Sequence, residues 1–202
     1  MHLKFKLLPE TLYITVNLVD RFCEKQKVSR SDYQLLGITA MLIACKYEEI
    51  AVPSIDHFIE MTDNAYTKDQ VKNQEWKILH TLEYNLTFPS IYRFLERYAK
   101  LANCNEVTFN LAAYLCELTL LEVKMNRWLP SRIACAAIYL AKKMLKAEQC
   151  WTKTMSKHTG YSVKDVRESA RNIVILMNIA PGSSLYDPVF KKYSAGKFLR
   201  VA

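Results

Sequence analysis

Lys46 is a charged residue at a position where the sequence predicts an apolar helix face. It lies near the end of the run 34–49, QLLGITAMLIACKYEE, in which Leu35 and Leu42 share its helical spacing. Because an unpaired charge is costly to bury, we expect this ammonium group to have a designated partner.

Glu75 has the same character on a second predicted helix, 67–82. Val71 and Ile78 share its face, so this carboxylate also stands within an apolar stripe. The simplest interpretation is structural: Lys46 and Glu75 pair across two adjacent helices. The residues alone leave open whether the two charges also bind a partner.

Other residue types show no catalytic or metal-binding pattern. The sequence has no GxSxG, HExxH or P-loop motif, and its four histidines are isolated. The six cysteines are widely spaced without a CxxC motif, which favours free thiols in a reducing compartment. Glu48 and Glu49 are interpreted as a solvated helix end rather than an acid/base pair. We therefore expect no enzymatic activity, no metal and no cofactor.

Length and charge set the remaining bounds. The 202 residues suit one or two globular domains. No signal peptide is recognised and no apolar run reaches the ~18 residues of a membrane span, so we expect no membrane partner. The net charge of +8 favours acidic partners, and the basic residues are spread along the chain without blocks, which favours protein surfaces over nucleic acid.

Helical periodicity runs through the whole chain. It predicts helices over residues 9–25, 31–47, 54–61, 67–82, 90–102, 106–123, 131–146, 151–158 and 163–178. Pro9 is expected in the first turn of its helix, and Ser29 or Ser31 is expected to cap the second helix.

Two segments predict capping boxes, and they belong to an internal repeat. Thr67 with Gln70, and Ser162 with Asp165, have the required spacing. A gap-free shift of ~96 residues places TAMLIACK on CAAIYLAK and aligns three successive predicted helices. Each half is therefore expected to be a small bundle around a central apolar helix.

Segments spread over nearly the whole chain resemble signatures of the cyclin family. They are LLPETLYITVNLVDRF (7–22), ACKYEE (44–49), YNLTFPSIYRFLERYAK (84–100), YLCELTLLE (114–122), LPSRIACAAIYLA (129–141) and the tail VFKKYSAGKF (189–198). The combination is specific, and the chain is identified as a member of the A/B group of mitotic cyclins, with the B type favoured.

The resemblance implies an all-α fold of two tandem five-helix bundles. The amino-terminal cyclin box would cover 1–88, and the carboxy-terminal cyclin fold and tail would cover 89–202. The chain opens at HLKFKLLPE and lacks the family's "MRAILVDWLVQV" helix. We therefore expect a first bundle truncated at its amino-terminal helix, with an apolar groove that is open unless another segment fills it. A smaller departure is AVPS (51–54), where the family has "YPPE".

The resemblance also implies a function: binding and allosteric activation of a cyclin-dependent Ser/Thr protein kinase at the G2/M stage of the cell cycle, in nucleus and cytoplasm. In the family, the residues matching Lys46 and Glu75 hydrogen-bond to the regulatory helix of the kinase and its flanking backbone. Surrounding apolar residues would exclude water from this clamp. Matched by position, they are Ile43, Tyr47, Leu79, Tyr84 and Leu86. For each, the alternative is plain core packing.

A second family site docks RxL-type motifs of substrates or inhibitors. Its main wall is the absent helix, and the remnants by position are Arg30, Tyr33, Gln34 and Met61. We therefore expect weak or absent docking. Two other functions remain as alternatives: a cyclin-fold, transcription-factor-like adaptor that binds nucleic acid, and an inactive scaffold or fragment.

Overall fold

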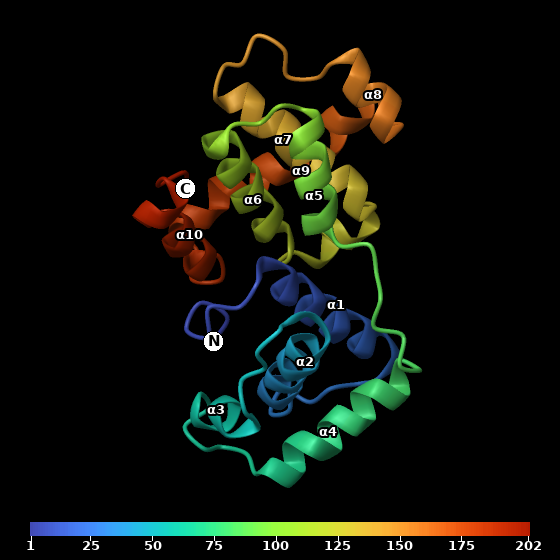
Figure 1. Ribbon diagram of the computed structural model, residues 1–202, viewed down its shortest axis with the longest axis vertical. Coiled ribbons are helices and arrows are strands. Elements are labelled where there is room, and N and C mark those ends of the chain that lie inside the picture. The colour runs from blue at the N-terminus through green and yellow to red at the C-terminus, as the bar shows by residue number, and fades with distance from the viewer. The chain divides into compact units, whose positions relative to one another are not determined.

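The computed structural model describes all 202 residues, which divide into two compact units, Met1–Phe88 (unit 1) and Pro89–Ala202 (unit 2). Every regular element is a helix (Figure 1). The predicted all-α class is therefore confirmed. No single helix is long and apolar enough to cross a membrane. The segments Val163–Gly182 and Asp187–Tyr193 reach the required length and hydropathy only together, as a pair bent by 92°.

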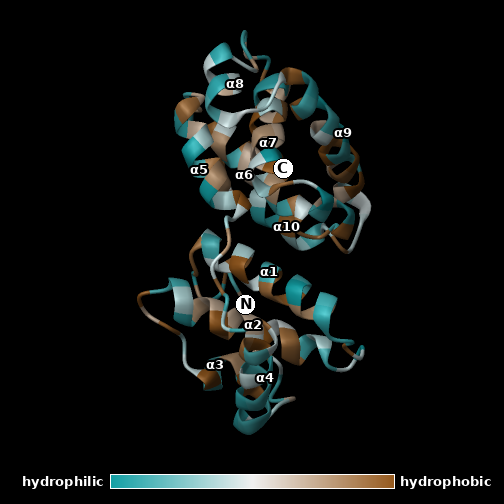
Figure 2. Cartoon of the chain, turned by 90° about the vertical axis from the view of Figure 1, so that its right-hand side faces the viewer, coloured by the Kyte–Doolittle hydropathy of each residue, from teal (hydrophilic) through white to brown (hydrophobic).

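Unit 1 contains four α-helices: α1 (Pro9–Lys25), α2 (Tyr33–Glu48), α3 (Ile55–Glu60) and α4 (Lys68–Thr81). Every residue from 38 to 45 in α2 is buried, and α2 packs against the other three helices. Figure 2 shows the apolar residues gathered on the faces that helices turn toward one another. Unit 1 is thus a bundle of helices around the central α2.

Two apolar clusters fill unit 1. One joins α1, α2 and α4 through Leu18, Phe22 and Ile78. The other lies between α2 and α3, and residues that precede α1 complete it: the ring of Phe5 lies 5.2 Å from that of Phe58, edge to face. The chain's first residues therefore cover apolar surface on the α2–α3 side.

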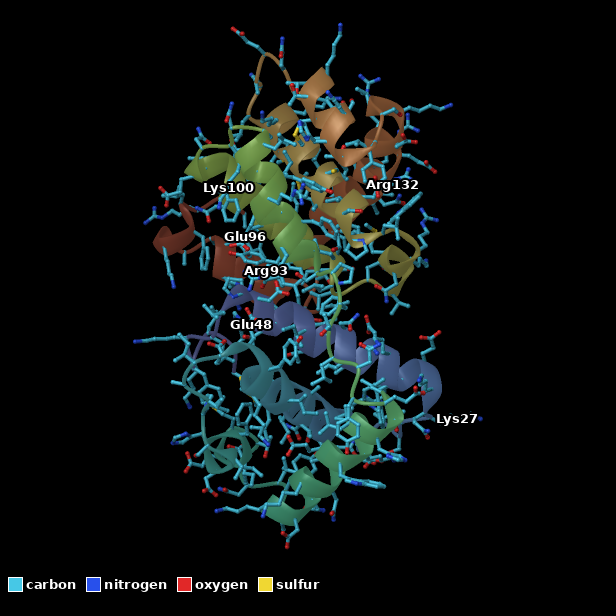
Figure 3. The ribbon with its side chains drawn as sticks, turned by 45° about the vertical axis from the view of Figure 1, so that its right-hand side comes forward. Lys27, Glu48, Arg93, Glu96, Lys100 and Arg132 are labelled. Atoms are coloured by element: carbon cyan, nitrogen blue, oxygen red, sulfur yellow. The ribbon has the colours of Figure 1, made fainter.

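Unit 2 surrounds a central helix in the same way. It contains α5 (Ile91–Leu101), α6 (Glu106–Thr119), α7 (Pro130–Met144), α8 (Lys153–Thr159), α9 (Val163–Ile179) and α10 (Asp187–Tyr193). Helix α7 packs against α5, α6 and α9, and all its residues from 133 to 141 are buried. Helix α5 carries Arg93, Glu96 and Lys100 on its outer side (Figure 3) and buries Leu95.

The end of unit 2 departs from the sequence-based expectation. The helix predicted over 106–123 ends at Thr119 and is followed by a 3₁₀ turn, and α10 was not predicted. Helix α10 is fixed by a contact distant in sequence: Lys192 Nζ lies 2.6 Å from Glu117 Oε2, with both side chains 7% exposed. The hydroxyl of Tyr193 donates to the same oxygen at 3.0 Å.

Helix starts follow most of the predicted signals. Pro9 lies in the first turn of α1, and both capping boxes form, at Thr67 and at Ser162. The predicted serine cap of α2 is wrong. Asp32 is the N-cap and makes no side-chain cap; its backbone is helical (φ −93°, ψ −9°) rather than extended as in a capping residue, and its carboxylate accepts a 2.7 Å hydrogen bond from the Ser29 hydroxyl.

Candidate partner-binding site on unit 1

Lys46 and Glu75 form an ion pair at the surface of unit 1. Lys46 Nζ lies 2.7 and 2.8 Å from the two carboxylate oxygens of Glu75. The lysine lies in the last turn of α2, where the helix dipole favours a cation, and its side chain is 51% exposed. The carboxylate comes from α4 and is only 17% exposed. The predicted pairing across two helices is therefore correct.

Helix α4 positions Glu75 through the residues that flank it on the same face. Val71 and Ile78 are fully buried, which turns this face of α4 toward the core. The pair itself contributes little to folding, on the order of 0–1 kcal/mol for an ion pair as open as this one. Exchanging these charges for those of a partner would therefore cost the fold little.

The five apolar residues predicted around the pair fall into two groups. Tyr47 and Tyr84 are 48% and 62% exposed and offer contact area to a partner. Leu79 and Leu86 are partly buried against the core, and Ile43 is a core residue. Ile43 is therefore a core residue that supports this surface without being part of it, which is the core-packing alternative given for it above.

Both tyrosines are held by neighbouring groups. The hydroxyl of Tyr47 lies 2.7 Å from that of Thr87. Tyr84 has a left-handed backbone (φ 56°), and its N–H donates to the carbonyl of Leu79 at 2.9 Å. Arg21 of α1 donates to the next carbonyl, that of Asn85, at 2.8 Å. Helix α1 thus anchors the segment that presents Tyr84.

Glu49 has a structural role that the sequence interpretation missed. One of its carboxylate oxygens accepts the backbone N–H of Leu8 at 2.7 Å and the hydroxyl of Thr11. The solvated-pair interpretation is therefore wrong for Glu49, which holds the first turn of α1.

Trp76 was also missed by the sequence analysis. It follows Glu75 in the sequence, its side chain is exposed, and its ring stacks on that of His80 with ring centroids 5.0 Å apart.

The predicted docking remnants lie along the start of α2 and the end of α3. Arg30, Tyr33 and Gln34 are exposed, and Met61 is half-buried. The amide oxygen of Gln34 accepts a hydrogen bond from the hydroxyl of Tyr66 at 3.3 Å. Gln34 is therefore already partly satisfied within the chain.

The cysteines and acidic side chains form no metal-ligand cluster. All six cysteines are free thiols. Burial raises the pKa of Cys45 and of Cys135 to about 12, so both thiols are protonated and weakly nucleophilic near neutral pH.

Comparisons with known proteins agree with this arrangement of two helical units. The family description "Cyclin, N-terminal domain" matches residues 1–87, and "Cyclin, C-terminal domain" matches residues 89–202. The chain belongs to the cyclin family.

Among curated relatives, Cyclin-B1-4 of Arabidopsis thaliana is 46% identical over 206 residues, which cover 100% of this chain and 52% of that protein. G2/mitotic-specific cyclin-B of Hydra vulgaris is 43% identical over 199 residues, covering 98% and 55%. The chain thus spans about half the length of the curated relatives it matches. The predicted likeness to B-type cyclins is confirmed.

Solved structures confirm the fold. A viral cyclin from herpesvirus saimiri superposes with a TM-score of 0.76 at 16% identity, covering 95% of this chain and 82% of its own. A chain of the yeast RNA Pol II CTD kinase CTDK-1 complex gives a TM-score of 0.71 at 16% identity, covering 90% and 62%.

Proposed function

We propose that this chain is the regulatory subunit of a cyclin-dependent Ser/Thr kinase, that it activates this kinase for mitosis, and that it works in nucleus and cytoplasm. The observation that carries the proposal is the Lys46–Glu75 pair at the surface, with an exposed lysine and a largely buried carboxylate, flanked by the exposed Tyr47 and Tyr84. The relatives named as mitotic cyclins support the choice of partner and stage. We infer no catalytic role for the chain itself.

Activation would follow from differential binding. A kinase exchanges between inactive and active positions of its regulatory helix, and a partner that binds the active position better raises its population. When that helix rotates inward, the kinase forms its own internal Lys–Glu ion pair, which aligns ATP, and its activation loop becomes ordered. In this complex Lys46 and Glu75 would pair with polar groups of the kinase, while the tyrosines exclude water.

A charge-swap series tests this role. The single variants Lys46→Glu and Glu75→Lys each break the ion pair and present a wrong charge to the kinase. The double variant restores an ion pair within the chain but inverts both charges toward the partner. We expect all three to lose kinase activation and co-elution with a purified monomeric kinase by more than about 10-fold, because truncating a buried, hydrogen-bonded interface charge costs about 2–5 kcal/mol.

The matched control is a second surface ion pair of unit 1, in which Lys68 Nζ lies 2.8 Å from Asp56 Oδ1. Its swap, Lys68→Asp with Asp56→Lys, is expected to leave activation unchanged. If the Lys46/Glu75 double variant activates the kinase normally, the pair is structural only and the proposal fails.

We further infer that RxL-type peptides dock weakly, because the Gln34 oxygen is already hydrogen-bonded to Tyr66. Titration of an RxL peptide that reached micromolar affinity would contradict this inference. For the nucleic-acid alternative, the discriminating measurement is salt: DNA binding falls steeply with salt concentration, whereas a mostly apolar kinase interface is much less sensitive.

A further inference from the structure

The positive charge of the chain belongs to unit 2. Residues 1–88 hold 10 of the 28 lysines and arginines but 12 of the 20 aspartates and glutamates. Unit 2 therefore holds the other 18 basic and 8 acidic residues, so the two units carry net charges of −2 and +10. The basic residues are spread over both units, as expected, but the acidic residues that balance them lie mostly in unit 1.

A hollow of about 750 Å³ opens in unit 2 where several of these basic residues gather. Its lining residues come from α7, from the segment that joins α7 to α8, and from the first turns of α8 and α9. Figure 1 shows where these helices lie in unit 2. Lys143, Lys153 and Arg167 line it, and Glu148 is the one carboxylate among its lining residues.

The three cations of the hollow have no counter-ion within the protein. Lys143 and Lys153 make no ion pair, nor does Glu148. The Nε of Arg167 donates to the hydroxyl of the buried Tyr139 at 3.1 Å. This bond orients the guanidinium and leaves both of its terminal nitrogens available.

An apolar wall accompanies the charges. The indole N–H of Trp151 is shared between the Ser156 hydroxyl at 2.9 Å and the Tyr161 carbonyl at 3.3 Å, which fixes the ring at the edge of the hollow. Val163 adds further apolar surface. The hollow therefore offers N–H donors to an anion and the face of the Trp151 ring to an apolar side chain next to that anion.

We propose that this hollow binds a phosphorylated peptide segment. A phosphate group carries a charge of about −1.5 to −2 and three strong acceptor oxygens, which match three unpaired cations. The planar guanidinium of Arg167 is oriented by Tyr139 and presents a fork of N–H donors that suits a bidentate contact with two phosphate oxygens. Trp151 would pack against the peptide residue beside the phosphate. Duplex DNA fits less well, because it needs cations in a row along a backbone, whereas these three cations line a single hollow.

The test uses the full chain without kinase, so its outcome does not depend on Lys46 and Glu75. Fluorescence anisotropy follows a labelled nine-residue peptide with a central phosphothreonine beside a leucine and no other charge. We expect it to bind at least about 10-fold more tightly than its unphosphorylated twin, since hydrogen bonds to charged groups are the strong ones. A glutamate twin is expected to bind in between.

Variants locate the site. Lys153→Ala with Arg167→Ala is expected to weaken phosphopeptide binding by about 10-fold or more. The matched control, Lys124→Ala with Arg200→Ala, removes the same two charges from exposed positions elsewhere in unit 2 and is expected to change binding less than about 2-fold.

Three results would overturn the proposal. Equal weakening by both double variants would mean general attraction to a basic unit. Displacement of the phosphopeptide by inorganic phosphate at equal concentration would mean a simple anion site. Stronger binding of a labelled DNA duplex, lost in the same Lys153/Arg167 variant, would assign the hollow to nucleic acid.

Discussion

The two units differ in the partner that they provide for a lysine at the end of the central helix. Lys46 in α2 and Lys142 in α7 occupy equivalent places in the repeat, in the last turn of each helix. Lys46 reaches a carboxylate on α4, whereas Lys142 Nζ donates to the carbonyl of Ala102 at 2.5 Å. Ala102 is the C-cap residue of α5.

The position of Glu75 also differs between the units. The capping boxes place Thr67 opposite Ser162, a spacing of 95 residues, so the gap-free alignment is wrong by one residue at α9. In the corrected register Ala170 replaces Glu75, and it is buried. Unit 2 therefore packs the equivalent helix pair without the ion pair. The fold does not require Glu75, which supports a role for the pair in binding.

The largest expected contrast lies between a buried ion pair, Lys192 with Glu117, and the surface pair of Lys46 with Glu75, whose lysine is half exposed. Lys192→Ala leaves the carboxylate of Glu117 buried without its cation, and we expect the free energy of unfolding of unit 2 to fall by about 3–5 kcal/mol. Lys46→Ala is expected to cost unit 1 no more than about 1 kcal/mol. Urea unfolding followed by circular dichroism measures both; equal losses would contradict the contrast.

The next effect tests whether Lys142 fastens α5. Lys142→Met keeps the apolar stem and removes the donor to the Ala102 carbonyl, so we expect a loss of about 1–2 kcal/mol of unfolding free energy. Hydrogen exchange should show faster opening of the last turn of α5 while α6 is unchanged. Unchanged exchange at α5 would show that water replaces the lysine at no cost.

These contacts show which features of the structure could be predicted from the sequence. The central helices and both capping boxes depend on local spacing, so periodicity sufficed. Lys46 and Glu75 were found because each interrupts an apolar stripe. Helix α10 depends on the contact of Lys192 with Glu117, 75 residues away, which no local pattern encodes.

One error and two omissions had different causes. The register error at α9 arose because the dipeptide Lys-Asp occurs at 68–69 and again at 164–165, so that a shift of 96 residues superposes the two, although the helix starts at Thr67 and Ser162 are 95 residues apart. The concentration of positive charge in unit 2 could have been counted from the sequence once the division at residue 88 was drawn. By contrast, the hollow near Arg167 forms only where three segments pack together, so the sequence alone could not predict it.

A variant that gives unit 1 the residue found at the equivalent position of unit 2 tests whether Glu75 is needed for folding or for binding. Glu75→Ala copies the alanine of the equivalent position in α9, and we expect a change of less than about 1 kcal/mol in unfolding free energy. Kinase activation is expected to fall by more than about 10-fold in the same variant, because the carboxylate would be lost from the interface. A stable variant with full activation would remove Glu75 from the proposed site.

The smallest effect concerns alkaline pH and applies to both units. Burial raises the pKa of Cys45 in unit 1 and of Cys135 in unit 2 to about 12, above the ordinary thiol value of 9.0. The unfolded chain therefore loses these protons first, so their contribution to stability is complete below pH 9 and declines as the pH rises toward 12. Urea midpoints at pH 8, 9 and 10 should fall, and fall less in Cys45→Ala with Cys135→Ala. An identical decline in that variant would assign the alkaline sensitivity to other groups, such as Tyr193, whose pKa is also raised by burial.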